Sequence, residues 1–179
     1  RSLSGMPRWR GIFHRPLLGV SRDVTHSACE AQGLDAWNDP HNDDPSYRRV
    51  RARQLLRSLE GELGPGFGAA LARSADLLRE DADYLDEVSA QARAGVGMIS
   101  EISVAAMEAL PRPLRTRVWR LLAVEAGSPV GSVTAAHVES LDALITAWHG
   151  QGPLHVPGPV RVKRSGGHIA LEAVPRPLV

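Results

Sequence analysis

Cysteine and lysine are almost absent from this chain: Cys29 and Lys163 are the single examples of each among 179 residues. A lone cysteine excludes an intrachain disulfide and a cysteine-based metal site, and it is typical of a reducing cytoplasm. The seven histidines have no metal-ligand spacing such as HExxH, so we expect no metal site. No apolar run approaches membrane-spanning length, and no secretory hydrophobic region is present. The sequence therefore predicts a cytoplasmic protein with no membrane partner.

Net charge is also small, at +1, so attraction of the whole molecule to a polyanion is not implied. Any electrostatic binding must come from local patches of charge. Twenty of the 21 basic residues are arginine, whose planar fork of donors suits phosphate. Biased codon usage also explains this excess, because alanine and glycine are abundant too. Aromatic residues make up only 4% of the chain, which disfavours a surface that stacks single-stranded bases.

Apolar residues recur at helical spacing through the middle of the chain. Ser21 is predicted to cap a short helix over residues 22–32, which Gly33 ends. Further helices are predicted over residues 47–63, 67–92, 113–126 and, with Thr134 as N-cap, 134–148. Short strands are expected over residues 11–13, 34–37 and 102–104. The stripes expected to be buried are Ala52, Leu55, Leu56, Leu59 and Leu63 on the first long helix, and Phe67, Leu71, Leu78, Leu85 and Val88 on the second.

The C-terminal segment changes to the alternating pattern of strands. Gly166 and Gly167 form a two-residue turn between two such runs, which predicts a β-hairpin. Counting outward from the turn places Arg161 opposite Glu172 and Val162 opposite Leu171. We expect the hairpin to pack against the helices or to pair with a strand elsewhere.

The stretch DPHNDDPSYRRVRAR, residues 39–53, concentrates both signs of charge in fifteen residues. Arg49, Arg53 and Arg57 recur every four residues, so they form one stripe that borders the leucine face of the helix. An acidic, polar turn ahead of this stripe fixes the directions of its side chains, and fixed guanidinium groups recognise phosphate. Internal salt bridges from Asp39, Asp43 and Asp44 are the alternative interpretation of the same pattern.

Two motifs with their spacing make the sequence similar to tRNA(Ile)-lysidine synthases. The RPLL element at residues 15–18 is followed by a short helix, then by Asp39 and Asn42 of an Asp-x-x-Asn pattern, and then by Tyr47, Arg49 and Arg53. Val50 stands where that family has Asn. The stretches LPRPLRTRV (residues 110–118) and WHGQGP (residues 148–153) fit the helical substrate-binding domain of the family. The resemblance covers most of the chain.

The resemblance implies a ligase that uses ATP, with Mg, to attach lysine to the wobble cytidine in the CAU anticodon of isoleucine tRNA. The family binds the pyrophosphate on a Ser-Gly-Gly-x-Asp-Ser loop, which this chain lacks. SGG at residues 165–167 continues with His and Ile and lies in the predicted hairpin turn, so we reject it as a phosphate loop. We therefore expect the C-terminal portion of the enzyme, with no tight cofactor binding of its own.

The expected fold class is mainly α: the remnant of an α/β nucleotide-binding domain in residues 1–46, then a small helical bundle with a C-terminal β-hairpin in residues 47–179. By the resemblance, Arg15 is the candidate catalytic residue beside the reacting cytidine, with an ion pair to Asp39 as its alternative role. Arg49, Arg53 and Arg57 are the candidate tRNA-binding residues, supported by Asp39, Asn42 and Tyr47. The competing function is a helical interaction or homodimerisation module without RNA binding. In that case the acidic face of residues 67–92 would pair across subunits with the arginine cluster at positions 112, 115, 117 and 120.

Overall fold

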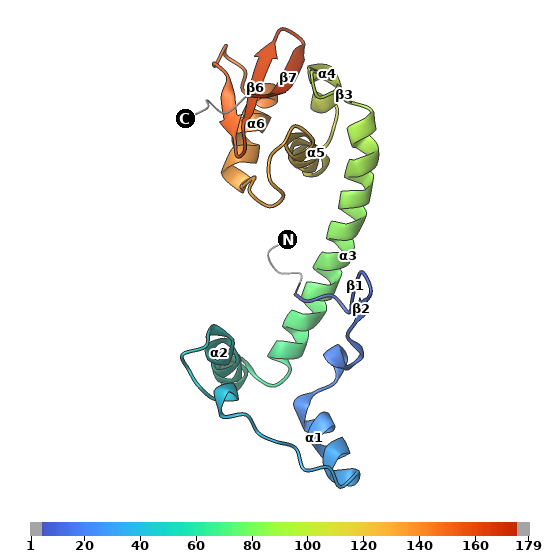
Figure 1. Ribbon diagram of the computed structural model, residues 1–179, viewed down its shortest axis with the longest axis vertical. Coiled ribbons are helices and arrows are strands. Elements are labelled where there is room, and N and C mark those ends of the chain that lie inside the picture. The colour runs from blue at the N-terminus through green and yellow to red at the C-terminus, as the bar shows by residue number, and fades with distance from the viewer. Residues whose placement is uncertain (1–4, 175–179) are drawn as a thin grey trace. The chain divides into compact units, whose positions relative to one another are not determined.

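The computed structural model describes residues 5–174, and the chain divides into two compact units within one long helix. Unit 1 runs to Glu80 and unit 2 begins at Asp81 (Figure 1). The predominance of helix is as predicted. No helix among residues 5–174 combines the length and the apolar character needed to cross a membrane. The domain boundary predicted between residues 46 and 47 lies inside unit 1 and stays a prediction.

Unit 1 begins with a hairpin in which β1 (Trp9–Arg10) pairs antiparallel with β2 (Phe13–His14). A 3-10 turn, η1 (Pro16–Gly19), leads to α1 (Arg22–Ala31), whose N-cap Ser21 accepts a hydrogen bond from Val24 N–H as predicted. A second 3-10 turn, η2 (Pro40–Asn42), precedes α2 (Arg48–Leu63) and the long α3 (Phe67–Ala94), which continues into unit 2. The strand predicted over residues 34–37 is wrong, because that segment is irregular.

Residues 5–46 give no evidence of a nucleotide-binding sheet, so the α/β remnant expected there stays a prediction. A nucleotide-binding sheet needs parallel strands joined by crossover helices, and this segment has two antiparallel strands of two residues each. The buried stripe predicted on α2 is also wrong, since Leu55 and Leu63 are each 63% exposed. Among residues 5–80, Val50 is the one fully buried hydrophobic side chain. Short loops and turns supply no second layer against which the leucines of unit 1 could pack.

Unit 2 contains the end of α3 and three further helices, α4 (Val104–Glu108), α5 (Arg112–Glu125) and α6 (Ala135–Thr146). The helices predicted over residues 113–126 and 134–148 are confirmed as α5 and α6, although α6 ends two residues early. Thr134 caps α6, and the His137 side chain accepts from the Thr134 N–H in return. Val133 and Val138 on either side of the cap are both buried, as expected for a hydrophobic staple.

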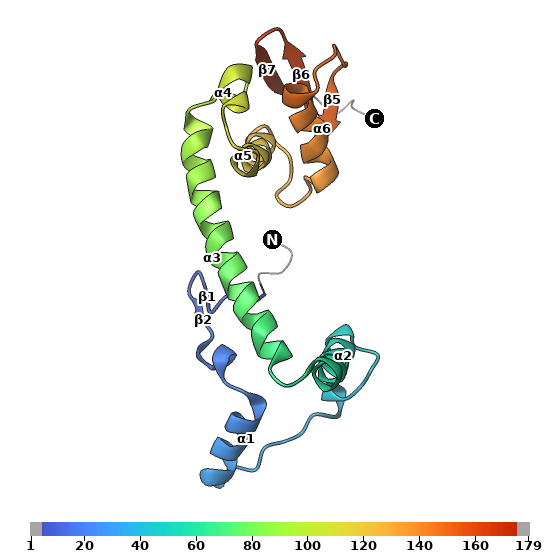
Figure 2. The same cartoon turned by 180° about the vertical axis from the view of Figure 1, so that it is seen from behind.

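A five-stranded antiparallel sheet completes unit 2, in the order β3-β4-β7-β6-β5. Figure 2 labels its strands β5, β6 and β7. The strands are β3 (Gly97–Met98), β4 (Glu101–Ser103), β5 (Leu154–Val156), β6 (Val160–Ser165) and β7 (His168–Ala173). The predicted hairpin register is confirmed, with Arg161 opposite Glu172 and Val162 opposite Leu171. Of the two alternatives for the hairpin, pairing with other strands is also observed, because β7 pairs with β4 and β6 pairs with β5.

The core of the described chain lies in unit 2, between this sheet and its helices. Trp119, Leu122, Leu141, Ile102, Val162 and Ile169 are all almost inaccessible to solvent. The alternation of buried and exposed residues along β6 and β7 gives the sheet one apolar face toward α5 and α6 and one polar face. Unit 2 therefore presents its polar side chains from a rigid scaffold.

Candidate nucleic-acid interface

The polar bend ahead of α2 is held by hydrogen bonds from its own residues. The Asp39 carboxylate accepts from His41 N–H at 2.9 Å and lies 2.9 Å from His41 Nδ1, and Asn42 N–H donates to the Asp39 carbonyl oxygen. These bonds from His41 lower the pKa of Asp39, and the charge of Arg49 adds to the effect. Asp39 and Asn42 thus fix the shape of the turn.

A second aspartate of the bend also binds backbone and not arginine. Asp44 accepts from Ser46 N–H at 2.8 Å, and this hydrogen bond lowers the pKa of Asp44. Among residues 5–174, no salt bridge joins Asp39, Asp43 or Asp44 to an arginine of α2. The acidic residues of the motif therefore order the approach to the helix and form no ion pair with its arginines.

Arg49, Arg53 and Arg57 of the stripe are all exposed. The Arg49 guanidinium carbon lies 5.2 Å from the centre of the Tyr47 ring, in a cation–π contact that limits its directions. Within the described part of the chain, no carboxylate pairs with any of the three. The structure therefore brings Asp39, Asn42, Tyr47 and Arg49 together at the start of α2, with two further free guanidinium groups along the helix.

The N-terminus of α2 is unusually positive. Five arginines lie within its first ten residues, the first turn has no acidic residue, and no side chain caps it. Aligned peptide dipoles add partial positive charge at the same end. Arg51 adds to this positive charge, because its Nη1 donates to the neutral carbonyl oxygens of Pro45 and Ser46, at 2.7 and 2.9 Å, and not to a carboxylate. The positive charges at this end of α2 repel one another, and an anionic partner would relieve that repulsion.

Arg15 lies apart from this group, beside the β1–β2 hairpin. Its Nη1 donates to the Pro7 carbonyl oxygen at 3.3 Å, and the side chain is half-buried. It lines a cavity of about 540 Å³ with Arg10 and the apolar Ile12 and Phe13. No ion pair with Asp39 is present among the described residues, so the alternative role of Arg15 finds no contact in the structure. Arg10, which sequence reasoning passed over, is the second cation of this cavity.

Two arginines of the cluster in the alternative function form ion pairs within unit 2. Arg115 is buried and bound to Asp142, at 2.6 Å from Nε to Oδ1, and Arg117 binds Asp86 at 3.0 Å. These two of the four side chains serve the fold of their own subunit. Of these four arginines, Arg112 and Arg120 have no carboxylate partner among the described residues.

The chain is similar in sequence to a family model and to several known proteins. The family model described as TilS substrate binding domain matches residues 102–169, all within unit 2. The chain is 45% identical over 175 residues to tRNA(Ile)-lysidine synthase of Thermobifida fusca (strain YX), covering 97% of this chain and 54% of the relative. It is 46% identical over 176 residues to the synthase of Streptomyces coelicolor, covering 96% and 50% respectively.

The chain is homologous to tRNA(Ile)-lysidine synthases over about 95% of its length, and it contains the substrate-binding domain of these proteins. The similarity extends to the synthase of Mycobacterium tuberculosis (strain ATCC 25618 / H37Rv), at 44% identity over 172 residues, 92% of this chain and 52% of the relative. The chain spans about half the length of the curated relatives it matches. The resemblance read from RPLL and the arginine motif is thereby confirmed.

Two features of the family motifs acquire a structural explanation. Val50, which replaces the expected Asn of the motif, is 3% exposed. An apolar residue therefore occupies a position that water does not reach. Ser165, Gly166 and Gly167 form the turn between β6 and β7, with Gly166 at a φ of 58°. This turn joins two strands and not a strand and a helix, so its residues do not fit the pyrophosphate of ATP.

Proposed function

We propose that the protein of which this chain forms part uses ATP to attach lysine to the wobble cytidine of the CAU anticodon of isoleucine tRNA, and that this chain supplies mainly tRNA recognition. In this proposal residues 1–46 are the end of the catalytic domain, and residues 47–179 form the tRNA substrate-binding domain. Family membership supports the reaction, and the family uses ATP. The described residues hold no pyrophosphate loop.

The observation that carries tRNA recognition is the set of exposed guanidinium groups on α2. Arg49, Arg53 and Arg57 lie on one side of the helix, exposed and without a carboxylate partner among the described residues. Asp39 and Asp44 before them accept hydrogen bonds from backbone N–H groups, so pairing with the arginines would require breaking the turn. Arginines held in this way bind backbone phosphates, which position an RNA without reading its sequence.

Arg15 has a different proposed role, at the reacting nucleotide. Its cavity combines two guanidinium groups, from Arg10 and Arg15, with the apolar side chains of Ile12 and Phe13. This combination matches a nucleotide, which has an anionic phosphate and a flat apolar base. Arg15 would contact the cytidine or its phosphate, and the hydrogen bond to Pro7 holds it at the edge of the cavity.

A filter-binding titration of isoleucine tRNA against salt tests the arginine stripe. If three arginines each neutralise a phosphate, log affinity falls with log salt at a slope of about −2.7 from these contacts, about −0.9 each. Replacing all three with glutamine removes that part of the slope and weakens binding equally for all tRNA sequences. Arg73→Gln is the matched control for Arg53→Gln, because Arg73 is an exposed helical arginine outside the stripe.

Two outcomes would contradict the proposal. Equal affinity and equal slope for the wild-type chain and the triple variant would remove the role of the stripe. Failure of the wild-type chain to bind tRNA, together with formation of a stable dimer in sedimentation, would favour the interaction module instead.

A further inference from the structure

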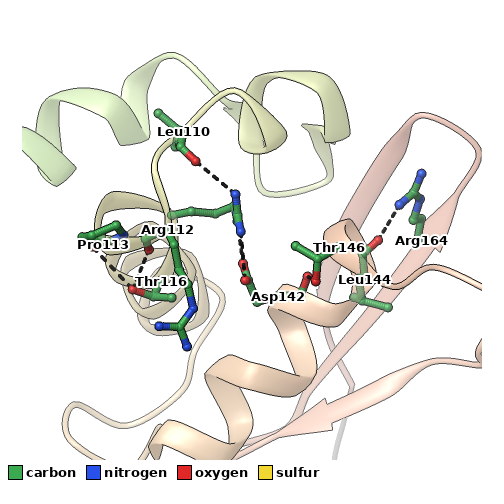
Figure 3. Close-up of polar contacts among 9 residues, drawn as sticks. Leu110, Arg112, Pro113, Thr116, Asp142, Leu144, Thr146 and Arg164 are labelled. Atoms are coloured by element: carbon green, nitrogen blue, oxygen red, sulfur yellow. Dashed lines mark hydrogen bonds and ion pairs between the residues drawn. The ribbon is translucent and has the colours of Figure 1, made fainter.

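Unit 2 has a second basic site, a pocket between α5 and α6. The pocket has a volume of about 400 Å³, within the range of small-ligand sites. Arg112, Thr116 and Arg120 line it from one face of α5, and Glu139, Asp142 and Thr146 line it from α6. Figure 3 shows Arg112, Thr116, Asp142 and Thr146 of this lining. Arg112 and Arg120 are two helical turns apart, about 12 Å along the axis, so their side chains stand at opposite ends of the pocket.

The floor of the pocket is rigid because its polar groups are already paired. Arg115 forms a two-pronged ion pair with Asp142, at 2.6 and 3.0 Å, and donates to the Leu110 carbonyl oxygen at 3.0 Å. The Thr116 and Thr146 hydroxyls donate to carbonyl oxygens one turn earlier in their own helices, those of Arg112 and Asp142 (Figure 3). The donors left for a ligand are therefore the guanidinium groups of Arg112 and Arg120.

Arg112 and Arg120 form no ion pair within the described residues, in contrast to four other arginines of unit 2. Arg93, Arg117 and Arg161 bind Glu125, Asp86 and Glu172, and Arg115 binds Asp142. Arg112 and Arg120 are exposed and have no carboxylate within 4.0 Å among residues 81–174.

Their orientation and charge favour an anion. Arg120 Nη1 donates to the Val133 carbonyl oxygen, which fixes its direction beside the pocket. With Arg115 neutralising Asp142, the two free arginines outnumber Glu139, the remaining carboxylate of the lining. The pocket thus keeps a net positive charge.

We propose that the α5–α6 pocket binds backbone phosphates of an RNA strand through Arg112 and Arg120. This inference rests on the proposed function and adds a phosphate contact in unit 2 to the stripe of unit 1. Guanidinium forks match phosphate geometry, and a helix face with two of them against a rigid floor holds the backbone in one register. Glu139 weakens the attraction of the pocket for phosphate, so its affinity is moderate. Such a site suits one of several contacts along an extended RNA and not tight binding of a free ion.

Binding of isoleucine tRNA by the whole chain, measured across salt concentrations, provides the first test. The variant Arg112→Gln/Arg120→Gln should lose about 1.8 of the salt slope, about 0.9 for each phosphate contact. Arg161→Gln is the control for one lost charge, since Arg161 is exposed but paired with Glu172 at 2.7 Å. Glu139→Gln should tighten binding by about two- to fivefold, the range for one exposed charge pair. An unchanged slope in the double variant, with wild-type binding intact, would overturn the pocket and leave the proposed function standing.

The second test does not depend on RNA. Inorganic phosphate is titrated into the wild-type chain while the arginine Nε–Hε signals are followed by NMR. The Arg112 and Arg120 signals should shift at phosphate concentrations that leave Arg161 unchanged. If the chain binds no tRNA, the proposed function fails, and this titration alone then decides whether the pocket recognises phosphate. Shifts equal to those of Arg161 would refute the pocket in either case.

Discussion

Replacing Asp142 with asparagine should destabilise unit 2 far more than an equivalent change at the surface. Asp142 and Arg115 are 7% and 8% exposed, and they join α5 to α6 through two charged hydrogen bonds. The same bonds raise the pKa of Arg115, so its charge persists at every ordinary pH. The amide of asparagine keeps one acceptor but turns N–H donors toward the guanidinium group. A buried cation is then left without its counter-charge.

The expected loss is about 3 to 5 kcal/mol, the range for removing one partner of a buried ion pair. Glu172→Gln is the matched control, because the Arg161–Glu172 pair has a similar distance, 2.7 Å against 2.6 Å, but side chains that are 44% and 51% exposed. Exposed pairs contribute about 0 to 1 kcal/mol, so the control should lose no more than this. The contrast isolates burial as the cause, since both changes remove one carboxylate.

Urea unfolding followed by tryptophan fluorescence measures this difference in unit 2. Trp119 is fully buried and Trp148 packs on the core, whereas Trp9 and Trp37 in unit 1 are already exposed. With an m value of about 1 to 3 kcal/mol/M, the midpoint should fall by about 1 to 5 M in Asp142→Asn. The apolar pair Arg115→Met/Asp142→Leu should recover at least part of the loss, because no unpaired charge is then buried. Equal midpoints for Asp142→Asn and Glu172→Gln would refute the reasoning.

Three further changes test local features. Val50→Asn, which restores the residue expected from the motif, should cost about 1 to 3 kcal/mol in unit 1 by burying an unpaired amide, and chemical denaturation would show no loss if Val50 were exposed. Gly97→Ala should destabilise unit 2 by at least about 1 to 3 kcal/mol, because Gly97 has a φ of 100° and an added Cβ would lie 2.6 Å from the Glu101 carbonyl oxygen; an unchanged melting temperature would contradict it. Acid should loosen the bend before α2: the pKa of Asp39 is lowered by folding, so its stabilisation is complete above about pH 3.9 and is lost as pH falls through the lower folded value. The protection factor of the His41 amide, which removes the intrinsic pH dependence of exchange, should fall over that range, and a constant protection factor would count against the turn.

The candidate interface shows what sequence pattern reveals and what it conceals. The four-residue spacing of the α2 arginines was visible in the sequence, because helical periodicity alone places them on one side. Whether the neighbouring aspartates would neutralise them was not visible, since both arrangements use the same residues. Backbone N–H groups of the bend compete for those carboxylates, and the folded turn decides this competition. The α5–α6 pocket was missed for a similar reason, because its two walls are separated in sequence and Arg112 and Arg120 look like the paired arginines around them.

Local signals in the sequence determined the caps of α1 and α6, the extent of α5 and the register of the β6–β7 hairpin, since each depends on residues close together in the chain. Only the tertiary structure decided which apolar stripes are buried. Val118 and Leu122 of α5 are buried in the core of unit 2, whereas Leu55 and Leu63 of α2 also recur at helical spacing and remain exposed in unit 1. Periodicity records which side of a helix is apolar, but burial requires a second surface, and that surface comes from distant parts of the chain.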